Sequence, residues 1–486
     1  MASRPLRSDP AAVVALLSGP GRTDLARFLI RQRWFAAKTR GIEAARVLDW
    51  AVLDPEAPFV LLLLDVDGDR YYVPVTVASG APADAAIAGQ DDRAVVDAHD
   101  DPRFAHRLLT AIAAGRSLPS AAGLVRFIPT PGWSFPPSLD GLSARRLTGE
   151  QSNTSVIVGR SLIVKSLRRP QAGINPDVEI TRFLTTRTRF RQVPRLAGDI
   201  EYVDADGRVA SLALLQEFID NTGDGWRYVT AALDSGGAAP DALPDPLLDD
   251  LRRLGEVTAG LHVALASVPE DPEFRPEPVT PADVQRWAAD IARELGGPGP
   301  ARLLAALPGT AGDHASRVAR AVAGLDPLIG TTVRIRGHGD YHLGQVLKTA
   351  GDFVIIDFEG EPARPLAERR TKHAPLRDVA GMLRSLDYAA HAVAFRRTGA
   401  DRAAAVARLL RWEARARRAF LDGYRAIAAA SGAPLVPVSE AAFERACAAF
   451  ELEKACYELS YELDNRPDWV AIPLAGITRI LSPSAA

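Results

Sequence analysis

Two short acidic motifs lie close together in the last third of the chain. Residues 338–345 read His-Gly-Asp-Tyr-His-Leu-Gly-Gln, which places the amide of Gln345 five residues after Asp340. Seventeen residues after Asp340, the apolar segment 354–356 leads into Asp357-Phe358-Glu359-Gly360. Phosphoryl transfer requires a carboxylate beside the acceptor hydroxyl, together with a carboxylate and an amide oxygen on Mg²⁺. Asp340 as catalytic base, with Gln345 and Asp357 as metal ligands, would supply this set.

Each motif also has a plainer interpretation, because Gly and Asp are common in turns. The order of the two motifs, and a strand-rich region with a candidate lysine before them, favour catalysis. Glu359 has two interpretations. If the strand continues past Asp357, Glu359 points to the same face and can reach a second metal ion; otherwise it is an ordinary loop carboxylate.

The segments that must position these residues change character along the chain. The first part predicts a helix at 24–33, strands at 45–53, 59–65 and 70–77 with a turn at Asp67-Gly68, and a helix at 102–114. Residues 143–219 predict a hairpin of 155–158 and 161–164 around Gly159-Arg160, a helix at 176–184 and a strand at 212–219. After a loop at 235–246, helical periodicity dominates, at 247–265, 281–295, 315–325 and 401–431. The acidic motifs therefore belong to a mostly helical region.

Composition excludes several classes of protein. The chain has 486 residues, 47% of them hydrophobic and 24% charged, which is typical of a folded protein with more than one domain. Its 58 basic and 60 acidic residues give a net charge of -2, so nucleic acid is not an expected partner. Cys447 and Cys456 lie on opposite faces of a predicted helix and are expected to be buried, reduced thiols. The longest apolar run, 59–64, is too short to span a membrane, and a cytoplasmic location is expected.

The two motifs resemble those of the aminoglycoside-phosphotransferase-like kinases, whose catalytic loop reads His-Gly-Asp-x-His-x-Gly-Asn. Gln345 departs from this pattern. Segments 357–362 and 375–390 are similar to the actinobacterial maltokinases, in which Gln at this position is usual, and the similarity extends to Arg33-Trp34-Phe35. The resemblance implies an α+β, two-lobed protein-kinase-like fold with three parts. These are an N-terminal α+β cap subdomain (1–130), a sheet-rich nucleotide-binding intermediate subdomain completing the N-lobe (131–222), and a mostly helical C-terminal lobe with the catalytic loop and sugar site (223–486).

The same resemblance implies a set of ATP-binding residues. Lys165 would bind the phosphates with Glu179 as its ion-pair partner, and the loop 150–155 would cover the phosphates. The hinge at 216–219 would pair with adenine through its backbone. The residues assigned in this way are Lys165, Glu179, Ser152, Asn153, Thr154, Gln216 and Phe218. A solvated lysine, a polar turn and a buried strand are the plainer interpretations of these three segments.

A helix at 446–464 is the predicted sugar-binding element. Glu451, Lys454, Glu458 and Tyr461 follow one stripe of this helix, and Tyr457 borders it. Periodicity alone favours a solvent-facing helix with Glu–Lys pairs. The resemblance to maltokinases instead implies that Lys454, Tyr457, Tyr461 and Glu458 contact the sugar.

Other polar residues around the motifs are assigned structural roles. His338 and His342 are expected to pack and hydrogen-bond the loop, Asp378 to hold the backbone of the catalytic loop, and His262 to lie in the core.

The resemblance implies an ATP- and Mg²⁺-dependent kinase that converts maltose to maltose 1-phosphate and so feeds α-glucan (glycogen) synthesis. Glucosamine or another aminosugar is the alternative acceptor, against which the ammonium of Lys454 argues. A kinase-like module that only binds sugar or nucleotide is the non-enzymatic alternative, but Asp340, Asp357 and Lys165 are all present. A monomer or small homo-oligomer, and association with a trehalose-processing enzyme, complete the expectations.

Overall fold

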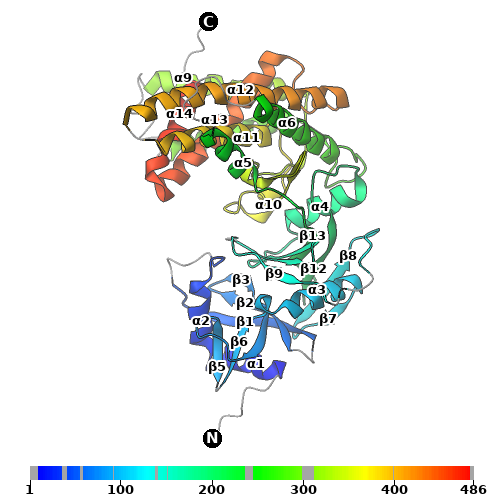
Figure 1. Cartoon of the computed structure of the whole chain (residues 1–486). Helices are drawn as coiled ribbons and strands as arrows, with labels where there is room; N and C mark the ends of the chain where they lie inside the picture. The colour runs from blue at the N-terminus through cyan, green and yellow to red at the C-terminus, as the bar shows by residue number, and fades with distance from the viewer. Residues whose placement is uncertain are drawn as a thin grey trace. The chain divides into compact units, whose positions relative to one another are not determined.

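The computed structural model describes residues 9–35, 41–54, 58–90, 92–136, 139, 141–149, 152–235, 245–297, 311–397 and 399–481 (Figure 1). Contacts divide the chain into two compact units. Unit 1 comprises Met1–Thr186 and Pro194–Ile219, and unit 2 comprises Arg187–Val193 and Asp220–Ala486. Unit 1 contains both large sheets, and unit 2 contains the long helices and the acidic motifs.

Unit 1 begins with two helices and a six-stranded antiparallel sheet in the order β1-β2-β4-β6-β5, with β3 paired to β2. The elements are α1 (Pro10–Ser18), α2 (Arg22–Arg31), β1 (Ala45–Asp54), β2 (Phe59–Val66), β3 (Asp69–Tyr72), β4 (Val75–Ser79), β5 (Ala86–Gln90) and β6 (Arg93–Asp97). The turn at Asp67-Gly68 is confirmed, because both residues have positive φ, as a tight two-residue hairpin requires. The single strand predicted at 70–77 is instead two strands separated at Pro74, which has no N–H to donate to a ladder.

A second, seven-stranded antiparallel sheet follows in the order β7-β8-β12-β13-β11-β10-β9. Its elements, with the helices that interrupt them, are η1 (Ala98–Asp100), α3 (Pro102–Ala113), β7 (Ser117–Pro119), β8 (Gly123–Pro129), β9 (Ala144–Arg146), β10 (Thr154–Val158), β11 (Leu162–Ser166), α4 (Pro176–Arg187), β12 (Leu196–Asp204) and β13 (Val209–Glu217). One apolar core joins the two sheets, since Phe59 and Leu61 of the first pack with α3 and with Val156 and Leu215 of the second.

Unit 2 is built around α11, most of whose side chains are buried. Helices α12 and α13 both pack against α11, and α12 also packs along α6 (Figure 1). The helices are α5 (Gly225–Ser235), α6 (Asp245–Leu265), α7 (Pro281–Gly296), α9 (Ala311–Val322), η2 (Ala323–Leu328), α10 (Leu366–Arg369), α11 (Leu376–Phe395), α12 (Gly399–Ser431), α13 (Glu440–Asn465), η4 (Pro467–Trp469) and α14 (Ala471–Leu481). The acidic motifs lie among short elements: β14 (Glu277–Pro278), β15 (Val333–Arg334), η3 (Leu343–Gln345), β16 (Val346–Lys348) and β17 (Phe353–Ile355).

Most predicted elements are confirmed, including the hairpin of β10 and β11 and the long helices α6, α7, α12 and α13. Cys447 and Cys456 are both buried and free, as expected. Within the described part of the chain, none of the helices has the length and apolar character needed to cross a bilayer. The predicted loop at 235–246 and residues 150–151 fall almost entirely outside the described residues.

Candidate functional site

The two acidic motifs are in direct contact in unit 2. Gly339 and Gly360 both have positive φ, and a Cβ on Gly339 would lie 3.3 Å from the Cα of Gly360. Asp357 adopts a φ of 67°, a left-handed conformation that residues other than glycine rarely occupy and that is often found at functional sites. The amide Nε2 of Gln345 donates to Oδ2 of Asp357 at 3.1 Å. The two side chains predicted as metal ligands are therefore neighbours.

Glu359 does not lie on a continued strand. Strand β17 ends at Ile355, and the left-handed turn at Asp357 breaks the alternation on which the expected orientation of Glu359 depended. A carboxylate oxygen of Glu359 nevertheless lies within 4.8 Å of one of Asp357. The turn, and not strand geometry, brings these two carboxylates together.

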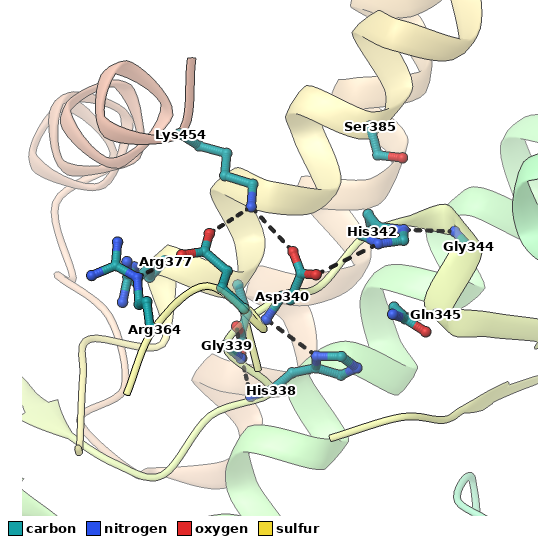
Figure 2. A network of polar contacts seen from close by, with 12 residues as sticks. His338, Gly339, Asp340, His342, Gly344, Gln345, Arg364, Arg377, Ser385 and Lys454 are labelled. Atoms are coloured by element: carbon teal, nitrogen blue, oxygen red, sulfur yellow. Dashed lines mark hydrogen bonds and ion pairs between the residues drawn. The ribbon is translucent and has the colours of Figure 1, made fainter. Parts of the chain in front are cut away.

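Lys454 from α13 connects Asp340 to a second carboxylate (Figure 2). Its Nζ donates to Oδ1 of Asp340 at 3.1 Å and to Oε1 of Glu361 at 2.8 Å. Glu361 also accepts from Nε of Arg364 at 2.6 Å. Burial opposes ionisation of Glu361, but the charges of Lys454, Arg377 and Arg364 outweigh it and lower its pKa to about 2. Burial likewise opposes the charge of Lys454, yet Glu361 and Asp340 raise its pKa. Lys454 is thus a cation shared by two carboxylates.

The second oxygen of Asp340, Oδ2, lies 4.0 Å from Nε2 of His342. Nδ1 of His342 accepts the backbone N–H of Gly344 at 3.0 Å, so the neutral ring carries its proton on Nε2. Burial lowers the pKa of His342 and favours this neutral form. His342 therefore presents a donor toward Asp340 and cannot accept the proton of Asp340 at this nitrogen, which agrees with the expected structural role.

His338 and Asp378 fix the backbone of the catalytic loop. Nε2 of His338 contacts the carbonyl oxygen of Ile356 at 2.9 Å and so joins the two motifs. Asp378 accepts the backbone N–H groups of His338 at 2.7 Å and Gly339 at 2.9 Å. Burial raises the pKa of Asp378, but hydrogen bonding and the charge of His262 outweigh this and bring the pKa to about 2. The predicted scaffold role of Asp378 is confirmed, and it is a structural anion.

A pocket beside Asp340 contains two of the four predicted sugar contacts. Lys454 and Tyr457 line it, with the ammonium of Lys454 4.9 Å from the centre of the Tyr457 ring. Glu458 instead forms a 2.8 Å ion pair with the buried Arg384. Tyr461 is 46% exposed, and its ring is covered by Arg466. Glu458 and Tyr461 therefore make contacts elsewhere and are not among the described residues that line the pocket.

Several residues that line this pocket have no predicted role, among them Glu361, Arg364, Arg377 and Glu453. Arg377 and Glu453 form a 2.8 Å ion pair. Glu361 directly follows the Asp-Phe-Glu-Gly motif, and this position in the sequence could have identified it as a candidate site residue.

The predicted nucleotide residues lie in unit 1. Lys165 pairs with Asp177, whose Oδ2 is 3.0 Å from Nζ, and Asp177 was not predicted. Glu179, the expected partner, is buried two residues further along α4. Lys165 therefore has a carboxylate partner on the expected helix, and its pairing with Glu179 stays a prediction.

The other predicted nucleotide residues differ in exposure. Ser152 is exposed and Asn153 is buried. The hydroxyl of the buried Thr154 accepts from Nε of Arg168 at 2.8 Å, so the side chain is already engaged. At the predicted hinge, Gln216 pairs with β11 and β12 on both sides, and the N–H of Phe218 donates to Ser161 at 2.8 Å. The backbone of this segment is largely used within the sheet.

Comparison with known proteins finds relatives of this chain that are kinases. Residues 28–101 match the family model of the maltokinase N-terminal cap domain. The glucosamine kinase of Streptacidiphilus jiangxiensis is 30% identical over 385 residues, which are 78% of this chain and 81% of that protein. The chain belongs to the glucosamine kinase family. A second member, from Mycolicibacterium smegmatis (strain ATCC 700084 / mc(2)155), is 30% identical over 345 residues, covering 69% of this chain and 79% of that protein.

Solved structures of the family show the same fold. A glucosamine kinase in complex with glucosamine, ADP and inorganic phosphate has a TM-score of 0.65 at 24% identity, covering 94% of this chain and 99% of that one. The fold is accordingly kinase-like and of mixed α+β class, with an N-terminal cap and a helical C-terminal region, as predicted.

Proposed function

We propose that this protein is an ATP-dependent sugar kinase whose acceptor is an aminosugar, with glucosamine as the first candidate. The observation that carries the proposal is the arrangement at Asp340. One of its carboxylate oxygens is held by Lys454 at 3.1 Å, the side chain is 22% exposed, and it lines a pocket. A carboxylate held in this way can accept a proton from a bound hydroxyl at its other oxygen. Family membership supports phosphate transfer.

The donor set near Asp340 suits Mg²⁺. Carboxylate and amide oxygens are the hard ligands that this ion prefers, and Asp357, Glu359 and Gln345 offer three of them. Gln345 needs only a rotation of its terminal amide to present oxygen in place of nitrogen. Bound Mg²⁺ would neutralise charge on the phosphate oxygens. In unit 1, Lys165 is the proposed phosphate ligand, and its ammonium forms a 3.0 Å ion pair with Asp177.

The charge of the pocket favours an ammonium-bearing acceptor. Its carboxylates belong to Glu294, Asp340, Glu361, Asp378 and Glu453, and its cations to Arg364, Arg377 and Lys454. The formal excess is negative. The ammonium of Lys454 argues against an aminosugar, but Asp340 and Glu361 both pair with it and compensate its charge. The named activity of the two relatives points the same way.

Maltose is the second candidate acceptor. The match of residues 28–101 to the maltokinase cap domain favours it, and with it a role in α-glucan synthesis.

The decisive experiment compares acceptors directly. Purified protein with ATP and Mg²⁺ is incubated with glucosamine, N-acetylglucosamine, glucose and maltose, and the phosphorylated product is identified by NMR. We expect glucosamine to be phosphorylated fastest and N-acetylglucosamine, which lacks the ammonium charge, to be poor. Preferential phosphorylation of maltose would contradict the aminosugar proposal but keep the kinase. If no sugar is phosphorylated, the kinase proposal itself fails.

A further inference from the structure

A buried polar cluster joins the cap to the hairpin that carries Lys165. Asp97 ends β6, and His99 lies just after it in η1. Nδ1 of His99 is 2.7 Å from Oδ1 of Asp97, and Nε2 of His99 is 2.8 Å from Oγ of Ser166. Nη2 of Arg168 donates to Oδ2 of Asp97 at 2.5 Å, and Nε of Arg168 donates to Thr154 at 2.8 Å. The cap thus contacts β11 directly, through His99 and Ser166, and β10 indirectly, through Asp97, Arg168 and Thr154.

The main chain and an aromatic ring reinforce this junction. The backbone N–H of Tyr72, at the end of β3, donates to the carbonyl of Arg168 at 2.9 Å. The guanidinium of Arg168 lies 4.7 Å from the centre of the Trp34 ring. Both partners belong to the segment 28–101 that matches the cap family. Arg168 is therefore surrounded by cap residues although it follows β11 in the chain.

The cluster has the residue types of a hydrolase triad, but it cannot act as one. Burial first, and then the charge of Arg168, lowers the pKa of His99 to about 4, so the ring is neutral near pH 7. Nδ1–H then donates to Asp97, and Nε2 accepts the hydroxyl proton of Ser166. However, Ser166 is 0% exposed, and His99 and Asp97 are buried with it. Because substrate cannot reach Ser166, the hydrogen bonds serve to hold position.

The alternation of side chains along a strand relates the contacts with the cap to the predicted nucleotide site. Thr154 pairs with Ser166, and Ser155 pairs with Lys165 in the β10–β11 ladder. Successive side chains of a strand point to opposite faces. The cap therefore holds one face of the hairpin, directly at Ser166 and through Arg168 at Thr154, while Lys165 points to the other face, toward Asp177. Ser152 and Asn153 precede Thr154 directly.

We propose that the cap is a positioning element for the nucleotide, with Asp97, His99 and Arg168 fixing the hairpin that presents Lys165 and the loop at 152–153. This inference rests on the proposed function, because it assumes that Lys165 contacts phosphate. It assigns the cap a role in ATP binding and none in recognition of the sugar.

The test uses two variants of the cluster and two matched controls. His99→Phe keeps a ring but loses both hydrogen bonds, and Ser166→Ala loses one. Asp49 of β1 provides the controls, because it is equally buried and joins the cap sheet to β12 through Tyr202 at 2.8 Å. Asp49→Asn and Tyr202→Phe weaken this second junction, which lies away from Lys165. KM for ATP, KM for the sugar, ADP affinity by calorimetry and Tm are measured for all four variants.

We expect His99→Phe to raise KM for ATP and weaken ADP binding by about tenfold, and Ser166→Ala by about threefold, as one or two lost hydrogen bonds would. KM for the sugar should stay within about twofold. The Asp49 and Tyr202 variants should lower Tm comparably and leave KM for ATP unchanged. Equal effects of both pairs on ADP affinity, or an unchanged ADP affinity in His99→Phe, would overturn the proposal. If the wild-type protein phosphorylates no sugar, the proposed function fails separately, and ADP affinity still decides whether the cap positions the nucleotide site.

Discussion

Two polar networks, one in each unit, use similar residue types but differ in their exposure. In unit 2, Asp340, Lys454 and Glu361 form a chain of alternating charge in which Asp340 and Lys454 stay 22% and 21% exposed (Figure 2). In unit 1, Asp97, His99 and Arg168 are buried, and each makes at least two hydrogen bonds. The first network leaves a carboxylate oxygen beside a pocket, and the second leaves none accessible. Access to a carboxylate oxygen, and not residue type, separates the proposed catalytic network from the structural junction.

The largest effect is expected for Asp340→Asn. The amide cannot accept the hydroxyl proton, so kcat should fall by about 10³-fold, within the range for loss of a general base. The substitution changes neither size nor fold appreciably, and ADP affinity should remain within about twofold in calorimetry. A variant that retains wild-type kcat would remove Asp340 from the mechanism.

The buried network of Asp97, His99 and Arg168 should instead affect how the stability of the protein depends on pH. His99 has a pKa of about 4 in the folded chain, whereas an unfolded histidine titrates near 6.5. Between these values the unfolded chain binds a proton that the folded chain does not, so the free energy of unfolding falls as pH is lowered from 7 to 5, by about 2 kcal/mol.

Urea denaturation at pH 7 and pH 5 measures this loss. The His99→Phe variant should show a smaller loss, since it lacks the titrating group, and Tyr202→Phe should show the wild-type loss. An identical pH dependence in His99→Phe and the wild-type protein would mean that His99 is already charged or already exposed in the folded state.

The sequence predicted the part of the site that lies in contiguous motifs. Asp340, Gln345 and Asp357 were predicted because their spacing is local, and Gln345 and Asp357 do meet. The pairing of Lys454 with Glu361 spans 93 residues and depends on how α13 packs, which periodicity does not report. Likewise, the pairing of Lys165 with Asp177 was not predicted, because it depends on the side-chain geometry at the start of α4.

Strand β12 shows why part of the fold escaped prediction. Its charged residues Asp199 and Glu201 interrupt the apolar pattern, yet both are buried in a central strand. They are accommodated by arginines from other elements, Arg182 at 2.5 Å and Arg126 at 2.7 Å. Burying a charge is tolerated only with such partners, and the partners are not visible from the strand alone.

The substitution Lys454→Met tests whether Lys454 assists Asp340 as the proposed catalytic base. Methionine keeps the length of the side chain but cannot donate to Asp340, and Glu361 retains Arg364. A hydrogen bond between charged groups contributes about 1.5–3 kcal/mol, so kcat should fall by about 10- to 100-fold. Steady-state kinetics measure this, with Glu440→Gln, which removes the 2.9 Å pair with Arg425 at the start of α13, as the control expected to keep kcat. A rise in the sugar KM with unchanged kcat would assign Lys454 to sugar binding alone.

The smallest effect separates two tyrosines that sequence analysis treated alike. Tyr457 lines the pocket beside Lys454, whereas Tyr461 is largely exposed beneath Arg466. Loss of an aromatic contact of about 1 kcal/mol predicts that Tyr457→Ala raises the sugar KM about fivefold, with the KM for ATP unaffected. Tyr461→Ala should leave the sugar KM within about twofold, because its ring packs against Arg466 and not in the pocket. If the two substitutions raise the sugar KM equally, the bound sugar extends along α13 beyond the pocket, which an acceptor longer than a monosaccharide would explain.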